Sequence, residues 1–245
     1  MTDDKLFPSD PCLVPGVQPL LSELKQPVSV WVHCPDDPQR GPVEDFVRRV
    51  FLRHYGATLS GTYPTLLSFN TGRRLRAAVG VRAAAGGSTF AEYYLPGPAE
   101  RLIAARWNQP VARSRLAEVG NLALASPGDA RWLIAAVTTF LHARGYRWVL
   151  FTAIRPLFNA FRRLGLNPVA LGPANPARLP DGGRDWGSYY DGGPVVCVGD
   201  VQAGYAKLSR SVRDGQPMLR RLLGDAVRAS LPCSHCAKTA KAGAR

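Results

Sequence analysis

The stretch that decides the fold is RSRLAEVGNLALASPGDARWLIAAVTTFLHARGYRWVLFTAIRPLFNAFRRLGL, residues 113–166. Its pattern predicts two strands that alternate with two helices. These span residues 113–122, 126–144, 146–153 and 156–164. Gly145 and Gly165 follow the two helices, where a glycine typically ends a helix in a left-handed conformation. The second strand is strongly apolar, which is typical of a strand buried on both faces of an α/β sheet.

The first of these helices begins directly after a strand, at Ser126-Pro127-Gly128-Asp129. Serine is a preferred N-cap, proline suits the first helical position, and an acid in the first turn complements the helix dipole. The N–H groups at a helix start lack intrahelical partners and favour anions. We therefore predict an anion site here, suited to a diphosphate, with Ser126 as one of its residues.

The rest of the chain predicts further short strands and helices. Strands are expected over residues 28–32, 66–69, 75–82, 169–171 and 195–198, and helices over 42–55 and 98–107. Residues 90–95 read either as a strand or as a helical turn. An amphipathic stretch covers residues 212–231, and residues 232–245 are expected to be disordered because they are short, basic and Ala-rich.

The composition is that of a globular chain. Its 245 residues are 46% hydrophobic and 20% charged, which excludes collagen, a coiled coil and a wholly disordered chain. Residues 1–5 lack the basic start and apolar run of a secretory signal. The most apolar region, residues 132–154, is interrupted by charges, so we expect no membrane span. The five cysteines are scattered and read as reduced thiols, and we expect a cytoplasmic protein.

The net charge of +13 raises the question of a nucleic-acid partner. Residues 201–245 hold nine Lys or Arg and two Asp, so more than half of the excess charge lies in the tail. The remainder is spread over the other 200 residues, and we expect no nucleic-acid partner. A basic surface also suits a phosphorylated donor or an anionic carrier protein.

Several common motifs are absent. There is no GxGxxG, P-loop, GxSxG or HExxH pattern, which argues against Rossmann oxidoreductases, P-loop NTPases, α/β-hydrolases and zincin proteases. Residues 233–236, Cys-Ser-His-Cys, supply half of a metal site at most, since a closed zinc site needs four ligands. We therefore predict no metal site and no permanently bound cofactor.

The helix over residues 156–164 ends in FNAFRRLGL, residues 158–166. This resembles the aromatic and Gly-aliphatic ending found in the GNAT (N-acetyltransferase) superfamily. The resemblance implies an α/β (α+β) fold with a splayed, mixed central sheet flanked by helices, in which two strands hold the pantetheine arm of the donor. The family's phosphate loop is Q/R-x-x-G-x-G/A. Here Gly128 and Ala130 keep its second part, whereas Ala125 replaces the Gln or Arg and Asp129 adds a negative charge.

Four motifs in order resemble a more specific family, the bacterial thermostable hemolysins. They are EVGNLA at 118–123, RWVLFTA at 147–153, FRRLGLNP at 161–168 and WGSYYD at 186–191. The resemblance covers most of residues 43–208, which we predict as a GNAT-like acyltransferase domain. Residues 1–42 are then an N-terminal extension, and residues 209–245 a basic helix and tail. Sequences of that family also resemble, more distantly, acyl-homoserine-lactone synthases.

Glu118 is the first candidate for a catalytic residue. It falls within an apolar strand beside the predicted anion site, where burial raises the pKa of an acid toward the range useful for a base. A carboxylate there would accept a proton from an attacking amine, directly or through a water. The resemblance to lactone synthases also implies an acidic residue on the comparable strand. The alternatives are an ion pair with Arg113 or Arg115, or a structural bond to a loop amide.

Other residues are assigned to the two substrates. The donor side takes Asn121, Leu122, Gly128, Ala130 and Asn159, although an ordinary turn role is the alternative for Asn121. The acceptor side takes Glu92 and Trp186, with a solvated edge position as the alternative for Glu92. Tyr189 and Tyr190 are candidates for an acid that protonates the departing thiolate, and aromatic packing under a loop is their alternative.

Together these observations predict an enzyme that transfers an acyl group from a CoA or phosphopantetheine (carrier-protein) thioester to a small amine. Two other hypotheses remain open. The first is a membrane-active protein, as the family's name implies, which would contact anionic membranes through residues 212–231. The second is a GNAT-like domain that binds a partner without catalysis, which the Ala at position 125 keeps open.

Overall fold

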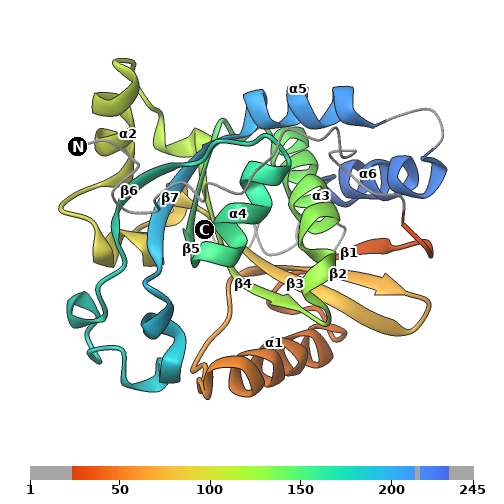
Figure 1. The fold of residues 1–245 in the computed structure, drawn as a ribbon, viewed down its shortest axis with the longest axis horizontal. Helices are drawn as coiled ribbons and strands as arrows, with labels where there is room; N and C mark the ends of the chain where they lie inside the picture. Colours follow the sequence, from red (N-terminus) through yellow and green to blue (C-terminus); the bar gives the residue numbers. More distant parts are fainter. Residues whose placement is uncertain (1–23, 213–215, 232–245) are drawn as a thin grey trace, which may run out of the picture.

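The computed structural model describes residues 24–212 and 216–231, which form a seven-stranded mixed sheet flanked by helices (Figure 1). The sheet order is β1-β2-β3-β4-β5-β7-β6. Only the central pair β4 and β5 is parallel, and all other neighbours are antiparallel. The strands are β1 Ser29–His33, β2 Thr65–Thr71, β3 Arg74–Ala83, β4 Leu116–Leu124, β5 Trp148–Ala153, β6 Val169–Pro173 and β7 Val195–Asp200. This confirms the predicted fold class.

The described residues also hold six α-helices and several 3-10 turns. The helices are α1 Arg40–Tyr55, α2 Ala99–Trp107, α3 Ala130–Ala143, α4 Arg155–Arg163, α5 Val201–Ser211 and α6 Pro217–Ala229. Two 3-10 segments matter for the site, η3 Phe90–Tyr94 and η7 Arg184–Gly192. Residues 90–95, for which the sequence left two possibilities, thus form a helical turn.

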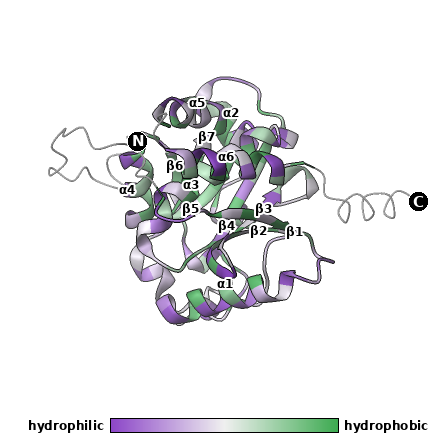
Figure 2. Cartoon of the chain, turned by 90° about the vertical axis from the view of Figure 1, so that its right-hand side faces the viewer, coloured by the Kyte–Doolittle hydropathy of each residue, from purple (hydrophilic) through white to green (hydrophobic). Residues whose placement is uncertain are grey.

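The two faces of the sheet are covered by different helices. On one face α1 packs Val47 and Phe51 against the sheet residues Ala78 and Ala123. On the other face the apolar helix α3 lies against the strands, with α4, α5 and α6 around it. Figure 1 shows α1 below the sheet and α3 above it, and Figure 2 shows the mainly hydrophobic strands between these layers. Helix α2 and η3 cover the α1 face farther along, over β5 and β7.

The central strands diverge, and this divergence positions the site. Strand β4 pairs with β5 only from Leu116 to Val119, although β4 continues to Leu124 beside β3. Just beyond the last pair, Asn121 has a φ of +47°, and the β3–β4 register shifts there, as in a β-bulge. The backbone of β4 beyond Val119 therefore has no ladder partner on the β5 side.

The C-terminal part of the described chain differs from the prediction. Residues 201–211 form a helix that the sequence analysis missed, and the domain boundary predicted at residue 208 falls inside it. Leu208 is fully buried. Helix α6 buries Leu219 and Leu222 completely in the same core as α3. The apolar face that was assigned to membranes is therefore part of the domain, because the side chains that would enter a bilayer already pack on α3.

The N-terminal boundary also moves. Residues 29–33 form the edge strand β1, which pairs with β2, and α1 begins at Arg40. Two of the predicted regions lie outside the described residues. They are the first part of the predicted N-terminal extension and residues 232–245, which hold the Cys-Ser-His-Cys motif and were predicted to be disordered. Cys34 is disulfide-bonded, which corrects the prediction of reduced thiols for that residue, whereas Cys197 is free and buried.

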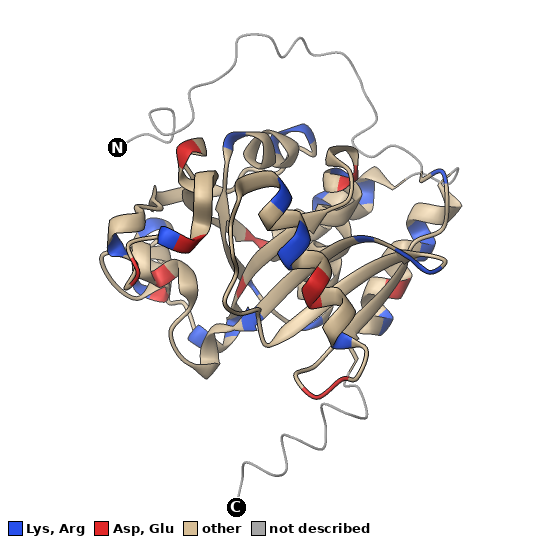
Figure 3. Cartoon of the chain, turned by 90° about the horizontal axis from the view of Figure 1, so that it is seen from below, with Lys and Arg blue, Asp and Glu red and all other residues tan. Residues whose placement is uncertain are grey.

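No helix among the described residues is long and apolar enough to cross a membrane. The basic residues do not form a single stripe in the view of Figure 3, where they are scattered over helices, loops and the ends of strands.

Candidate active site

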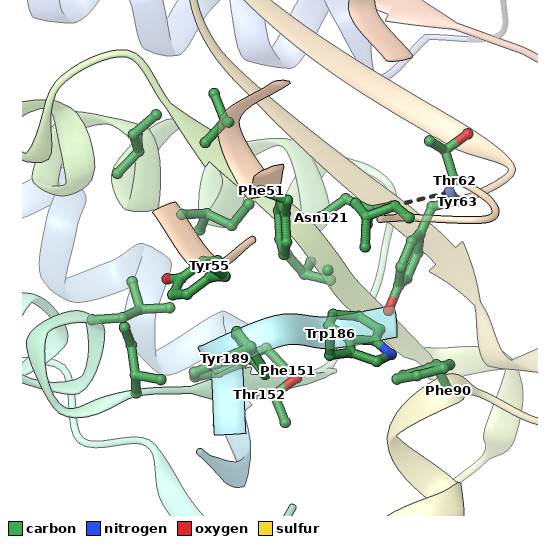
Figure 4. A pocket seen from close by; sticks show the side chains of 18 of the residues that line it. Phe51, Tyr55, Thr62, Tyr63, Phe90, Asn121, Phe151, Thr152, Trp186 and Tyr189 are labelled. Atoms are coloured by element: carbon green, nitrogen blue, oxygen red, sulfur yellow. Dashed lines mark hydrogen bonds between the residues drawn. The ribbon is translucent and has the colours of Figure 1, made fainter. Parts of the chain in front are cut away.

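A cavity of about 1110 Å³ passes through the sheet at the divergence of β4 and β5. Phe51 of α1 and Phe90 of η3 line it on one face, and Leu133 of α3 and Phe161 of α4 line it on the other. Helices on opposite faces can line one cavity only if it crosses the sheet between the separated strands. Figure 4 shows the part of the cavity where Tyr55, Trp186 and Tyr189 gather beside β5.

The end between α3 and α4 is mostly apolar, with two arginines among its lining residues. Ile134, Val137 and Phe161 contribute apolar surface there. Arg131, in the first turn of α3, and Arg163, the last residue of α4, also line the cavity. Within residues 24–212 and 216–231, neither guanidinium has a hydrogen-bond or ion-pair partner. Two unpaired cations next to an apolar channel suit a phosphorylated ligand with an acyl chain.

The start of α3 is tighter than the sequence predicts. Residues Pro127–Asp129 form a 3-10 turn, and the α-helix begins at Ala130. The N–H of Asp129 donates to the Ser126 carbonyl, and that of Ala130 donates to the Pro127 carbonyl. These two groups are therefore not open to a ligand. Proline has no N–H, so Gly128 offers the remaining amide of this turn, and Gly128 lines the cavity.

Asp129 does not carry an uncompensated charge at this end. Arg76 of β3 donates three hydrogen bonds to its carboxylate, at 2.7, 2.9 and 3.1 Å, and the Trp132 indole donates a fourth at 3.0 Å. The carboxylate is buried and bonded, so it ties the start of α3 to β3. The negative charge that the sequence placed beside the diphosphate site is thus neutralised by an arginine.

The centre of the cavity wall is built on two glycines that face each other across β3 and β4. Gly80 and Gly120 are register partners, and the ring of Tyr63 lies over both. A Cβ at Gly80 would lie 2.6 Å from the Tyr63 Cβ, and one at Gly120 would overlap the phenol. The Asn121 side chain fixes the same segment, since its Oδ1 accepts the Tyr63 N–H at 3.3 Å (Figure 4). Asn121 and Tyr63 both line the cavity.

Glu118 lies one layer behind this wall and is 1% exposed. Its two oxygens accept the N–H groups of Phe90 at 2.9 Å and Ala91 at 2.6 Å. Burial raises the pKa of the carboxyl, while these amides, Arg82 and the Tyr63 phenol oppose the rise. Glu118 is not among the cavity-lining residues, but Tyr63 is. The Tyr63 phenol is therefore a hydroxyl that contacts both the carboxylate and the cavity.

Of the alternatives weighed for Glu118, the bond to loop amides is present. The ion pair with Arg113 or Arg115 is absent from the described residues. Arg113 instead pairs with Glu92 and Glu100, and the guanidinium nearest to Glu118 is that of Arg82, at 3.9 Å.

Glu92 occupies a structural position. Its carboxylate accepts the N–H of Thr89 in a capping box and the N–H of Ala99 at the start of α2. It also pairs with Arg113 at 2.7 Å. Burial acts to raise its pKa, but the bonds to Arg113 and to the two amides hold the pKa at about 2. Glu92 does not line the cavity, so it joins η3, α2 and Arg113 and is placed away from the acceptor space to which the sequence assigned it.

An aromatic wall closes the cavity on the α1 face. Trp186 lies against Phe90 with ring centroids 5.6 Å apart and against Tyr189 at 5.3 Å. Burial raises the pKa of the Tyr189 phenol, which lines the cavity beside Thr152. The Tyr190 hydroxyl instead forms a 2.6 Å hydrogen bond with that of Tyr94.

The predicted site residues thus divide into two groups. Those that line the cavity are Asn121, Leu122, Gly128, Ala130, Trp186 and Tyr189. Those that do not are Glu92, Glu118, Ser126, Asn159 and Tyr190. Sequence reasoning missed Tyr63 and Arg82, both of which line the cavity next to Glu118. No cluster of His, Cys, Asp or Glu that could hold a metal occurs among the residues that the structure describes.

Comparison with solved structures supports the fold through TofI, whose TM-score is above 0.5. TofI in a ternary complex with an inhibitor and MTA has a TM-score of 0.51 at 18% identity, covering 74% of this chain and 96% of that chain. FeeM, an N-acyl amino acid synthase from uncultured soil microbes, has a TM-score of 0.48 at 14% identity over 74% and 95%. BjaI, a CoA-dependent acyl-homoserine lactone synthase in complex with SAM and isopentyl-CoA, has a TM-score of 0.49 at 13% identity over 80% and 98%.

Comparison with curated proteins finds no significant match. The thermostable hemolysin family, by contrast, matches residues 33–205. This range begins at the end of β1, ends within α5 and contains the whole cavity described above. Because the match covers most of its length, this chain belongs to the thermostable hemolysin family.

Proposed function

We propose that this protein is an acyltransferase that moves an acyl group from a CoA or carrier-protein thioester to a small amine. The observation that carries the proposal is the cavity through the divergence of β4 and β5. Such a cavity lets a donor enter from the α3–α4 face and an acceptor from the α1 face. Both then meet at the unpaired backbone of β4.

The donor would occupy the α3–α4 end. Arg131, Arg163 and the Gly128 amide would hold its phosphates, since charged groups and helix starts both favour anions. The apolar lining of α3, α4 and β5 would hold the acyl chain. A volume of about 1110 Å³ is at the upper end of small-molecule sites, which favours a chain longer than acetyl.

The reaction joins the amine nitrogen to the thioester carbonyl carbon and breaks the carbon–sulfur bond. Negative charge develops on the carbonyl oxygen, and N–H groups of β4 that lack a ladder partner beyond Val119 would stabilise it. The amine loses one proton, which passes to the Tyr63 oxygen as the phenol hands its own proton to Glu118. The thiolate takes up one proton, for which the Tyr189 phenol, already in the cavity wall, is the candidate donor.

The test is thioester turnover. The purified protein is incubated with acyl-CoA thioesters of two to twelve carbons, with the matching acyl carrier proteins, and with a panel of amines. Mass spectrometry then follows both the free thiol and the N-acylated product. We expect stoichiometric thiol and amide with at least one donor. Absence of acylated product with every donor and amine would overturn the proposal.

Donor binding is tested separately by calorimetry on Gly128→Trp. A Cβ at Gly128 has only the Ser126 hydroxyl nearby, at 3.9 Å, so the fold should tolerate the larger residue while its side chain blocks the cavity. Gly41→Trp is the matched control, because Gly41 also lies in open space near a helix start and does not line the cavity. Equal affinity of both variants for the thioester would contradict the donor site.

A further inference from the structure

Arg82 is a cavity-lining cation on the acceptor face of the sheet. It is the register partner of Glu118 across β3 and β4, directly next to the pair Gly80 and Gly120 that carries Tyr63. Its guanidinium lies over the Tyr63 ring, 5.3 Å from the centroid. One arginine, one buried carboxylate and one phenol therefore meet at the same point of the wall.

The hydrogen-bond donors of Arg82 are largely unused. Its Nε is buried and has no hydrogen-bond partner in the described structure, and its Nη1 makes one long bond of 3.5 Å to the Ser88 carbonyl. A buried donor without a partner costs free energy, so it calls for a ligand. Glu118, at 3.9 Å, is in ion-pair range but beyond hydrogen-bond range.

Two other arginines, the buried Arg40 and the half-buried Arg113, show what a structural arginine looks like in this chain. All three nitrogens of the Arg40 guanidinium donate hydrogen bonds, to Glu44, Thr62 and three backbone carbonyls. Arg113 likewise uses all three nitrogens, on Glu92, Glu100 and two carbonyls. Arg82 is built differently, because its Nε has no hydrogen-bond partner in the described structure, its Nη1 makes only one long bond, and the residue lines the cavity.

An anion bound to Arg82 would not be one of the donor phosphates. Arg131 and Arg163 line the cavity from α3 and α4, whereas Arg82 lines it on the α1 face beside η3. Phe90 and Trp186 contribute aromatic surface to that face. It also carries two acids, Asp181 just before η7 and Asp185 in the first turn of η7. These two acids would repel an anion, so the anion is confined to the neighbourhood of Arg82.

We infer that the acceptor is an α-amino acid or close analogue whose carboxylate pairs with Arg82, whose amine points to Tyr63, and whose apolar side chain packs on the aromatic wall. This inference rests on the proposed function and names its acceptor class. A guanidinium binds a carboxylate through two parallel N–H donors, which would satisfy the buried Nε. The product is an N-acyl amino acid, formed with release of the free thiol.

Binding is tested first, without any acyl donor. Calorimetry compares phenylalanine, leucine and tyrosine with phenethylamine, phenylalaninamide and O-phosphoethanolamine. We expect the amino acids to bind at least 10-fold more tightly than the two analogues that lack a carboxylate, as expected for a charge-assisted hydrogen bond. Arg82→Met should abolish this preference, whereas Arg101→Met should keep it. Arg101 is an exposed arginine on α2 outside the cavity, so Arg101→Met removes the same charge at a position away from the proposed site.

The turnover assay separates this inference from the proposed function. Binding that depends on the carboxylate, without acylation, would support the Arg82 site and contradict the proposed reaction. Acylation of phenethylamine as readily as phenylalanine, tighter binding of O-phosphoethanolamine than of any amino acid, or an unchanged preference in Arg82→Met would each overturn the inference. So would the absence of binding by all three amino acids.

Discussion

Replacement of Tyr63 by phenylalanine removes a single oxygen from the centre of the site. The ring that covers Gly80 and Gly120 stays in place, so the wall keeps its shape. The hydroxyl is the proton-carrying group that joins the buried Glu118 carboxylate to the cavity in the proposed path, because Glu118 does not line the cavity itself. Tyr63→Phe therefore tests whether protons leave the acceptor through this pair.

The expected losses of stability and of rate differ in size. The lost hydroxyl contact with a carboxylate costs about 1.5–3 kcal/mol at most, as for hydrogen bonds to charged groups. Loss of a positioned proton acceptor typically slows the chemical step by about 100- to 10,000-fold. Glu118→Gln is a less clean probe, because its oxygens accept the N–H groups of both Phe90 and Ala91. A glutamine NH2 would face one of these donors and leave it unpaired, which costs about 1–3 kcal/mol of stability as well.

The measurement pairs thermal unfolding with kcat for the wild type, Tyr63→Phe and the control Tyr205→Phe. Tyr205 lies on α5, stacked on His142 and outside the cavity, so its hydroxyl has no route to the acceptor. We expect only Tyr63→Phe to lose turnover by two orders of magnitude or more. Turnover of Tyr63→Phe within a few-fold of the wild type would refute the proton path, whatever its melting temperature.

Three further predictions follow from the same contacts. Burial raises the pKa of Glu118 above 4.5, so the folded state holds this proton to higher pH than the unfolded state. A protonated Glu118 cannot act as a base, so kcat/KM should fall as the pH is lowered, with the decline beginning above pH 4.5. Tyr63→Phe should lose this pH dependence. The pKa of Glu92 is lowered to about 2, so its contribution to stability is present above pH 4.5 and is lost as the pH falls toward 2. Glu92→Gln should therefore lower Tm at pH 7 but hardly at pH 2, and kcat should stay nearly unchanged. Leu222→Ala should cost about 2–5 kcal/mol by chemical denaturation, and a chain truncated at residue 208 should fail to fold, whereas folding of that truncated chain would contradict the packing of α6.

Much of the fold could be predicted because its helices and strands follow from the local pattern of apolar residues, caps and glycines. The order of elements over residues 113–166 follows from the helix-start signal at Ser126, the glycine stops and the apolar strand between the two helices. The structure has this order, with a 3-10 turn at Pro127–Asp129 before the α-helix begins at Ala130. Pattern does not say what an amphipathic helix covers. The apolar positions of α6 fit a membrane surface and a protein core equally well, and the structure buries them against α3.

The sequence predicted the part of the candidate site that lies on a single strand, β4. Glu118 and Asn121 are close in sequence, so the sequence placed both at the same point. Tyr63 and Arg82 reach that point from a loop and from β3, through a register that sets Gly80 opposite Gly120. One signal was available and not used. Thr89-Phe90-Ala91-Glu92 has the spacing of a capping box, which assigns Glu92 to a helix start rather than to a substrate.

The distribution of charge along the cavity accounts for its passage through the sheet. A donor with phosphates and an acceptor with a carboxylate are both anions, and they would repel each other in one open cleft. The cavity-lining arginines lie instead on opposite faces, Arg131 and Arg163 on the helix layer and Arg82 beside η3. The only groups that need to meet are the thioester carbonyl and the amine, which carry no net charge at the moment of attack. In the proposed reaction the separation of β4 and β5 would bring those two groups together while the sheet keeps the anions apart.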